Sequence, residues 1–155
     1  MQGDIRNIEE LLRTAIKREE ESNALYTQAA KMVKSTPSRV LLEELAGEEL
    51  THKAKLEDLL ARGVTWVVRG HKEKVTDLKI SDYLVPQPLR EDADFQDVLT
   101  VAAKREKNAY DFYTAMSEVA QDQAVRNLFT WLANEEMKHK NKVETLYEEI
   151  VYKEF

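Results

Sequence analysis

The sequence of 155 residues has no cysteine, only four glycines and only three prolines. The lack of cysteine excludes disulfides, thiolate metal sites and cysteine-bound clusters. The scarcity of glycine and proline argues against an all-β sandwich or barrel, because such folds need many tight turns. No hydrophobic run approaches the roughly 18 residues of a membrane-spanning helix, and the first ten residues lack the apolar segment of a signal peptide. We therefore expect a cytoplasmic protein without a membrane partner.

Charged residues make up 34% of the sequence and hydrophobic residues 43%, a mixture typical of long amphipathic helices. The formal net charge of −6 gives no electrostatic basis for binding nucleic acid. Because a domain has roughly 150 residues, we expect residues 1–155 to form a single domain with its own hydrophobic core.

Hydrophobic residues recur at steps of three and four in four segments, as they do along one face of an α-helix. The first predicted helix extends from about Asp4 to Lys34 and is ended by Ser35-Thr36-Pro37-Ser38, because proline disfavours helical geometry in the preceding residue and serine suits the next N-cap. The second ends near Gly63. The third carries hydrophobic positions from Phe95 to Ala120, and the fourth from Leu128 to Ile150.

The connections between these helices predict the topology. Short turns near 35–38 and 121–123 would make helices 1 and 2, and helices 3 and 4, antiparallel hairpins. About thirty residues from Gly63 to Asp94 separate the hairpins, which is enough to span the bundle as one long crossover. A short helix is predicted within it near Ile80–Leu84. The expected fold class is an all-α four-helix bundle.

The sequence repeats itself at an offset of 87 residues. Residues 45–60 and 132–147 are identical at nine of sixteen positions without a gap, and Ala15-Ile16-Lys17-Arg18-Glu19 aligns with Ala102-Ala103-Lys104-Arg105-Glu106. We therefore expect the two hairpins to be related by a pseudo-two-fold axis.

Polar residues interrupt the hydrophobic face of each helix near its middle. They are Glu19 in the first helix, Glu49 and His52 in the second, Glu106 in the third, and Glu136 and His139 in the fourth. Counted from the turns at 1.5 Å per residue, they reach similar heights and converge inside the bundle. Four buried carboxylates need positive charge, which two divalent cations would supply. The i, i+3 spacing lets each Glu-x-x-His pair present both side chains on one face.

This ligand set resembles that of the ferritin-like di-iron and di-manganese carboxylate proteins. Ala15–Tyr26, Ala102–Tyr113 and Asp82-Tyr83-Leu84 look most like the rubrerythrin branch. The resemblance implies a ferritin-like bundle with two iron ions, or manganese ions, as cofactors. It also implies roles for the six residues: Glu19 and Glu106 as terminal ligands, Glu49 and Glu136 as bridging ligands, and His52 and His139 as one ligand to each metal.

Two departures limit the resemblance. Rubrerythrins carry an additional glutamate one turn from the ligand of the third helix, where this sequence has Ala103 and Ala109. The resemblance therefore does not extend to the glutamate that the family's peroxidase ligand switch uses. Rubrerythrins also append a rubredoxin module with four cysteines, and without cysteine we expect a separate electron donor protein.

The function expected from these features is that of a di-iron or di-manganese oxidoreductase of peroxidase type, with peroxide or dioxygen as its substrate. One alternative is ferroxidation followed by iron storage in a cage, although the sequence ends soon after the fourth helix and leaves no fifth. A purely structural bundle is another. A homodimer is the default expectation for an acidic bundle of this size.

Two tyrosines and two further glutamates lie close in sequence to the six candidate ligands. Tyr26 and Tyr113 lie seven residues beyond Glu19 and Glu106, about 10 Å along the helix axis, so they cannot reach the glutamate of their own helix. They either hydrogen-bond a ligand on a facing helix or serve as aromatic core residues. Glu48 and Glu135 point about 100° away from the adjacent candidates, and we leave them out of the site.

Overall fold

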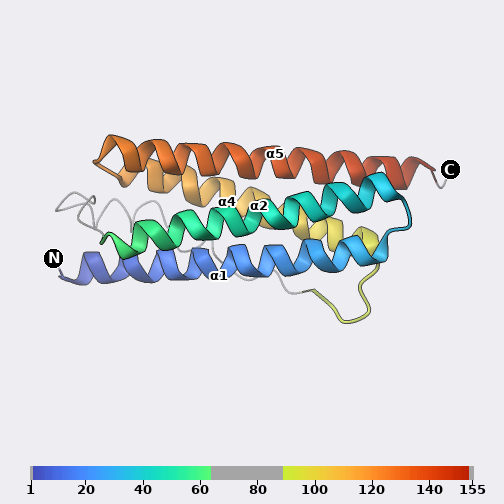
Figure 1. The fold of residues 1–155 in the computed structure, drawn as a ribbon, viewed down its shortest axis with the longest axis horizontal. Coiled ribbons are helices and arrows are strands. Elements are labelled where there is room, and N and C mark those ends of the chain that lie inside the picture. The colour runs from blue at the N-terminus through green and yellow to red at the C-terminus, as the bar shows by residue number, and fades with distance from the viewer. Residues whose placement is uncertain (1, 64–88, 154–155) are drawn as a thin grey trace.

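Four long helices lie side by side in the computed structural model, which describes residues 2–63 and 89–153 (Figure 1). They are α1 (Gln2–Met32), α2 (Thr36–Ala61), α4 (Phe95–Val119) and α5 (Gln123–Lys153). The most extensive packing is between α1 and α2 and between α4 and α5, so the helices form two hairpins. The end of α2 and the start of α4 lie at opposite ends of the bundle (Figure 1). The predicted all-α four-helix bundle is confirmed.

The first hairpin turns where the sequence predicts it. Ser35 is the N-cap of α2 and its hydroxyl accepts a hydrogen bond from the backbone N–H of Ser38, while Pro37 lies in the first turn, where its missing N–H has no intrahelical partner to lose. At the other end of α2, Gly63 has a φ of 87°. This left-handed conformation suits glycine, and the Gly63 N–H donates to the carbonyl of Leu60.

The second hairpin is fixed by aspartates at both helix starts. Asp94 and Asp97 form a capping box at the start of α4, each carboxylate accepting from the backbone N–H of the other residue. Before α5, the Asp122 carboxylate accepts from the N–H of Val125 at 3.1 Å. The Asp122 bond starts α5 only three residues after α4 ends, so the chain reverses where the sequence predicts.

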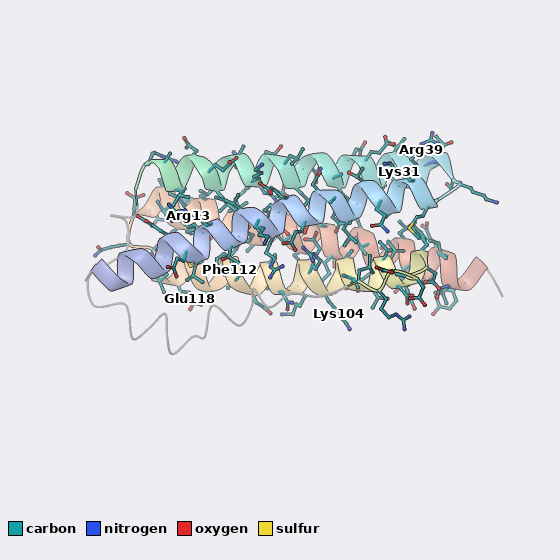
Figure 2. All side chains as sticks on the ribbon, turned by 90° about the horizontal axis from the view of Figure 1, so that it is seen from below. Arg13, Lys31, Arg39, Lys104, Phe112 and Glu118 are labelled. Carbon is teal, nitrogen blue, oxygen red and sulfur yellow. The ribbon has the colours of Figure 1, made fainter. Side chains whose placement is uncertain are left out.

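The apolar core is divided into two clusters along the bundle. One contains a large side chain from each helix, namely Leu12, Leu56, Phe112 and Phe129. The other cluster also contains a large side chain from each helix, namely Tyr26, Leu42, Leu99 and Leu146. Charged side chains such as Arg13 and Lys104 are exposed on the outer helix faces (Figure 2). Between the two clusters, every helix is left with polar residues facing inward.

The helix ends differ slightly from the predicted ones. For example, α1 ends at Met32 rather than at Lys34. The predicted crossover lies mostly in residues 64–88, and the short helix near Ile80–Leu84 lies wholly there, outside the residues that the structure describes. Over the described ranges, none of the helices is long and apolar enough to cross a membrane.

Candidate metal centre

Six ionisable side chains meet between the two apolar clusters. The carboxylates are Glu19 from α1, Glu49 from α2, Glu106 from α4 and Glu136 from α5, and the imidazoles are His52 from α2 and His139 from α5. None is more than 2% exposed. The structure thus brings together all six residues that the sequence singles out, and it does so because each lies where its helix passes from one apolar cluster to the other.

The six residues form two overlapping groups. Glu19 and His52 belong to the first and Glu106 and His139 to the second, while Glu49 and Glu136 belong to both. Within each group, one nitrogen or oxygen atom from every residue lies within 4.8 Å of the others. Such an arrangement could hold two cations side by side, with the shared carboxylates between them.

The imidazoles occupy related positions in the two groups. His52 Nδ1 lies 2.5 Å from Glu136 Oε1 and 3.6 Å from Glu19 Oε2. His139 Nδ1 lies 2.5 Å from Glu49 Oε1 and 3.6 Å from Glu106 Oε1. Their rings stack with 5.4 Å between centroids and 13° between planes. In both histidines, therefore, Nδ1 is the nitrogen directed at the carboxylates.

Many polar atoms of this cluster have no hydrogen-bond partner in the part of the chain that the structure describes. Among the six residues they are Glu19 Oε2, Glu49 Oε2, His52 Nε2 and Glu106 Oε2. His52 Nδ1 and Glu136 Oε1 lie 2.5 Å apart but do not have hydrogen-bond geometry. An unsatisfied buried polar atom ordinarily costs about 1–3 kcal/mol, and more when it is charged. So many in one place fit a site whose missing partners are cations, and the donor set of carboxylate oxygens and imidazole nitrogens is one that iron or manganese accepts.

Without cations, protons compensate part of the negative charge. Burial, together with the charge of Glu106 and other carboxylates, raises the pKa of Glu49 and Glu136 well above the usual carboxyl range. Burial also opposes ionisation of Glu19, but its interactions with Glu49, with His52 and with the Tyr113 hydroxyl lower its pKa overall. Burial likewise opposes the charged form of His139, yet nearby Glu106 and Glu48 raise its pKa.

Two tyrosines hydrogen-bond Glu106 and Glu19 from across the bundle. The Tyr26 hydroxyl donates to Glu106 Oε1 at 2.7 Å, and the Tyr113 hydroxyl donates to Glu19 Oε1 at 2.6 Å. Of the two roles considered for these tyrosines, the structure shows the hydrogen bond to a candidate ligand on a facing helix. Burial and the neighbouring carboxylates raise the pKa of both phenols well above 10.0, so they remain donors.

One contact was missed by the sequence analysis, which left Glu48 out of the site. Glu48 Oε2 lies 2.5 Å from His139 Nε2, the ring nitrogen that faces away from the four carboxylates. Glu48 does point away from Glu49 on α2, but α5 places the outer edge of His139 beside it. Its repeat equivalent, Glu135, instead pairs with Lys138 at 3.2 Å. No signal within α2 alone could have shown this contact, because it depends on how α5 packs.

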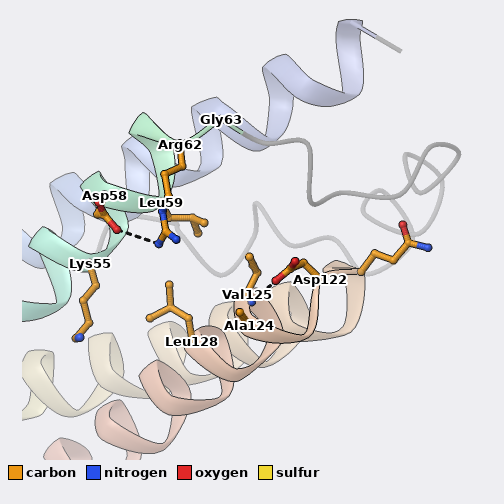
Figure 3. A pocket seen from close by; sticks show the side chains of 10 residues that line it. Lys55, Asp58, Leu59, Arg62, Gly63, Asp122, Ala124, Val125 and Leu128 are labelled. Atoms are coloured by element: carbon orange, nitrogen blue, oxygen red, sulfur yellow. Dashed lines mark hydrogen bonds and ion pairs between the residues drawn. The ribbon is translucent and has the colours of Figure 1, made fainter.

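Other features of the bundle do not contribute to this cluster. Ala103 and Ala109 pack against the apolar clusters and offer no ligand beside Glu106. A surface pocket of about 580 Å³ lies between the end of α2 and the start of α5, and none of the six residues lines it (Figure 3). Two of its charged side chains, Arg62 and Asp58, already pair with each other at 2.9 Å.

The helical bundle and its central cluster define the class of the protein, that of the ferritin-like carboxylate bundles. The chain matches the rubrerythrin family model over residues 10–147, and it belongs to this family. A hypothetical protein from Pyrococcus furiosus has a similar solved structure, with a TM-score of 0.71 and 25% sequence identity, over 93% of this chain and 90% of that chain. No curated protein matches the chain.

Proposed function

We propose that this protein is a di-iron or di-manganese carboxylate oxidoreductase that reduces peroxide or dioxygen. One observation carries the proposal, namely that two four-residue groups share Glu49 and Glu136 inside a buried, apolar bundle. A site for one ion would need only one such group. The family membership supports the same class of site.

The proposed ligand assignment follows the two groups. Glu19 and His52 would hold one ion and Glu106 and His139 the other, while Glu49 and Glu136, which belong to both groups, would serve both ions. Four ionised carboxylates balance the charge of two divalent ions, so the loaded site carries no net charge into the core. Oxygen-rich ligation with one imidazole for each ion favours iron or manganese over metals that prefer thiolates. When bound, these ions would supply the electrons that reduce the oxidant.

The remaining residues of the site keep the ligands in position. Tyr26 and Tyr113 each hold one oxygen of a terminal glutamate, which leaves the second oxygen, Glu106 Oε2 or Glu19 Oε2, without a described partner and available to an ion. Both phenols carry a proton at the hydroxyl oxygen, close to the carboxylates. The apolar clusters on either side exclude bulk water, which strengthens the electrostatic interactions within the site.

The proposal includes a separate electron donor protein, because these 155 residues contain no cysteine with which to hold an additional iron centre. It does not include a ligand switch at the helix turn after Glu106, because Ala109 occupies that position and packs against the apolar cluster.

Metal analysis and spectroscopy test the proposal. Protein purified without added metal, then titrated anaerobically with Fe²⁺ or Mn²⁺, should bind two ions per chain. The absorption spectrum of the iron-loaded form should change on addition of stoichiometric peroxide, and a chemical reductant should restore the first spectrum. The native mass, measured in parallel, would reveal a cage if the protein stored iron.

The outcomes separate the candidate functions. Binding of two ions with reversible oxidation supports the proposal. Accumulation of many iron ions per chain in a large assembly would replace it with storage, and a folded protein that binds no metal would leave only a structural role.

A further inference from the structure

The two histidines of the cluster are alike on their inner side and different on their outer side. Each directs Nδ1 at the shared carboxylates, as the internal repeat requires. The outer nitrogen of His139, Nε2, lies 2.5 Å from a carboxylate oxygen of Glu48. The outer nitrogen of His52, also Nε2, has no hydrogen-bond partner among the described residues.

The difference arises because the repeat is broken in the residues around each ring. Glu135 occupies the position equivalent to Glu48 but pairs with Lys138 on its own helix. His52 instead packs its ring against Trp131, edge to face, with 5.4 Å between centroids. Trp131 is 39% exposed and its repeat equivalent is Glu44, so His139 has no aromatic residue at the position equivalent to Trp131.

We propose that Glu48 is a positioning residue that makes the two metal positions unequal, with the His139 position binding its ion more tightly than the His52 position. This inference rests on the metal site proposed above. It goes beyond that proposal because the ligand set alone would make the two positions equivalent.

The physical basis is which nitrogen of each imidazole carries the proton. An imidazole binds a cation through one nitrogen only when the proton resides on the other nitrogen. A carboxylate at Nε2 accepts that proton in a hydrogen bond, fixes the ring orientation and increases the electron density at Nδ1. His139 has such a carboxylate in Glu48, whereas nothing described at His52 Nε2 can do the same.

The internal repeat supplies a matched control for the test. Glu48→Ala removes the contact with His139, and Glu135→Ala removes the equivalent glutamate, which makes no hydrogen bond to His52. Glu48→Gln retains an oxygen acceptor without the charge. All three proteins and the wild type would be titrated with Zn²⁺ against a chromophoric chelator, because Zn²⁺ is redox-silent and diamagnetic. Thermal unfolding of the unloaded proteins would report any general structural damage.

We expect the wild type to bind two Zn²⁺ ions in two unequal steps. Glu48→Ala should weaken the tighter step by about 10-fold to 100-fold, as loss of such a partner typically does. Glu48→Gln should recover part of that loss, and Glu135→Ala should leave both steps unchanged. In ¹H–¹⁵N spectra of the Zn²⁺-loaded wild type, one histidine should show a slowly exchanging Nε2–H, which Glu48→Ala should remove.

The results distinguish this inference from the proposal on which it rests. Wild-type protein that binds fewer than two Zn²⁺ ions would overturn the di-metal site itself. Two bound ions with equal losses in Glu48→Ala and Glu135→Ala, or with no loss in either, would overturn the role of Glu48 while leaving the di-metal site intact. The same conclusion would follow if the protected Nε2–H persisted in Glu48→Ala.

Discussion

Tyr113 donates a hydrogen bond to Glu19 across the bundle, with 2.6 Å between the hydroxyl oxygen and Oε1. The reciprocal bond joins Tyr26 to Glu106. Each tyrosine lies seven residues beyond the glutamate of its own helix and bonds the glutamate of the other hairpin. The repeat thereby places a matched pair of polar links between α1 and α4, at the boundaries between the cluster and the apolar core.

Removing one of these hydroxyl groups should destabilise the unloaded protein. Tyr113→Phe leaves Glu19 Oε1 without its donor, and we expect a loss of about 1–3 kcal/mol in the free energy of unfolding. Tyr26→Phe should lose a similar amount through Glu106. Urea denaturation would measure both losses. Tyr152→Phe is the control, because Tyr152 is 73% exposed. Tyrosine variants as stable as this control would contradict the prediction.

The shared glutamates should matter more for metal content than the unshared ones. Glu49→Ala or Glu136→Ala removes a residue common to both groups, so we expect loss of both ions. Glu19→Ala or Glu106→Ala removes a residue of one group only and should spare one ion. Elemental analysis after dialysis against a weak chelator gives the comparison. Greater loss in the second pair of variants would reverse the assignment of bridging and terminal ligands.

The unloaded protein should lose stability as the pH rises from about 5 to about 8. The pKa values of Glu49, Glu136 and His139 are raised in the folded state. A raised folded pKa contributes stability that is complete below the unfolded pKa and is lost as the pH rises through the folded pKa. Glu19 has a lowered pKa, so its contribution is lost only in the acid range below this window.

Metal should abolish this pH dependence, because bound cations keep the carboxylates ionised and paired. Chemical denaturation of the loaded and unloaded forms at both pH values measures the effect. Glu136→Gln should show a shallower decline than the wild type in the unloaded state, since one titrating group is gone. Parallel curves for the loaded and unloaded wild type would mean that the buried carboxylates do not titrate together.

Much of the fold follows from local features of the sequence. Period and capping predict where the helices begin and end, because Ser35 and Gly63 act through contacts with residues three positions away or fewer. The positions of the polar residues along the bundle axis could also be predicted, because helix geometry fixes the rise per residue and the turns fix where each helix starts. For this reason the sequence alone predicts that Glu19, Glu49 and Glu106 meet inside the bundle.

Contacts that depend on helix rotation could not be predicted in the same way. Whether the Tyr26 hydroxyl bonds a glutamate or packs elsewhere is decided by a few ångströms of lateral placement. The contact between Glu48 and His139 joins residues 91 positions apart and also breaks the repeat symmetry. A repeat predicts what the two halves share, whereas Trp131 and Glu44, which occupy equivalent positions, show where they differ.

The depth of the cluster has a consequence for the time scale on which ions exchange. All six residues are at most 2% exposed, and the two shared glutamates belong to different hairpins. An ion between them would link the hairpins, so it could leave only when the helices separate locally. Such openings have their own free energy and rate, which are independent of the strength of a competing chelator. Increasing the chelator concentration should therefore raise the rate of ion removal only to a plateau. At that plateau, local opening of the bundle is the rate-limiting step.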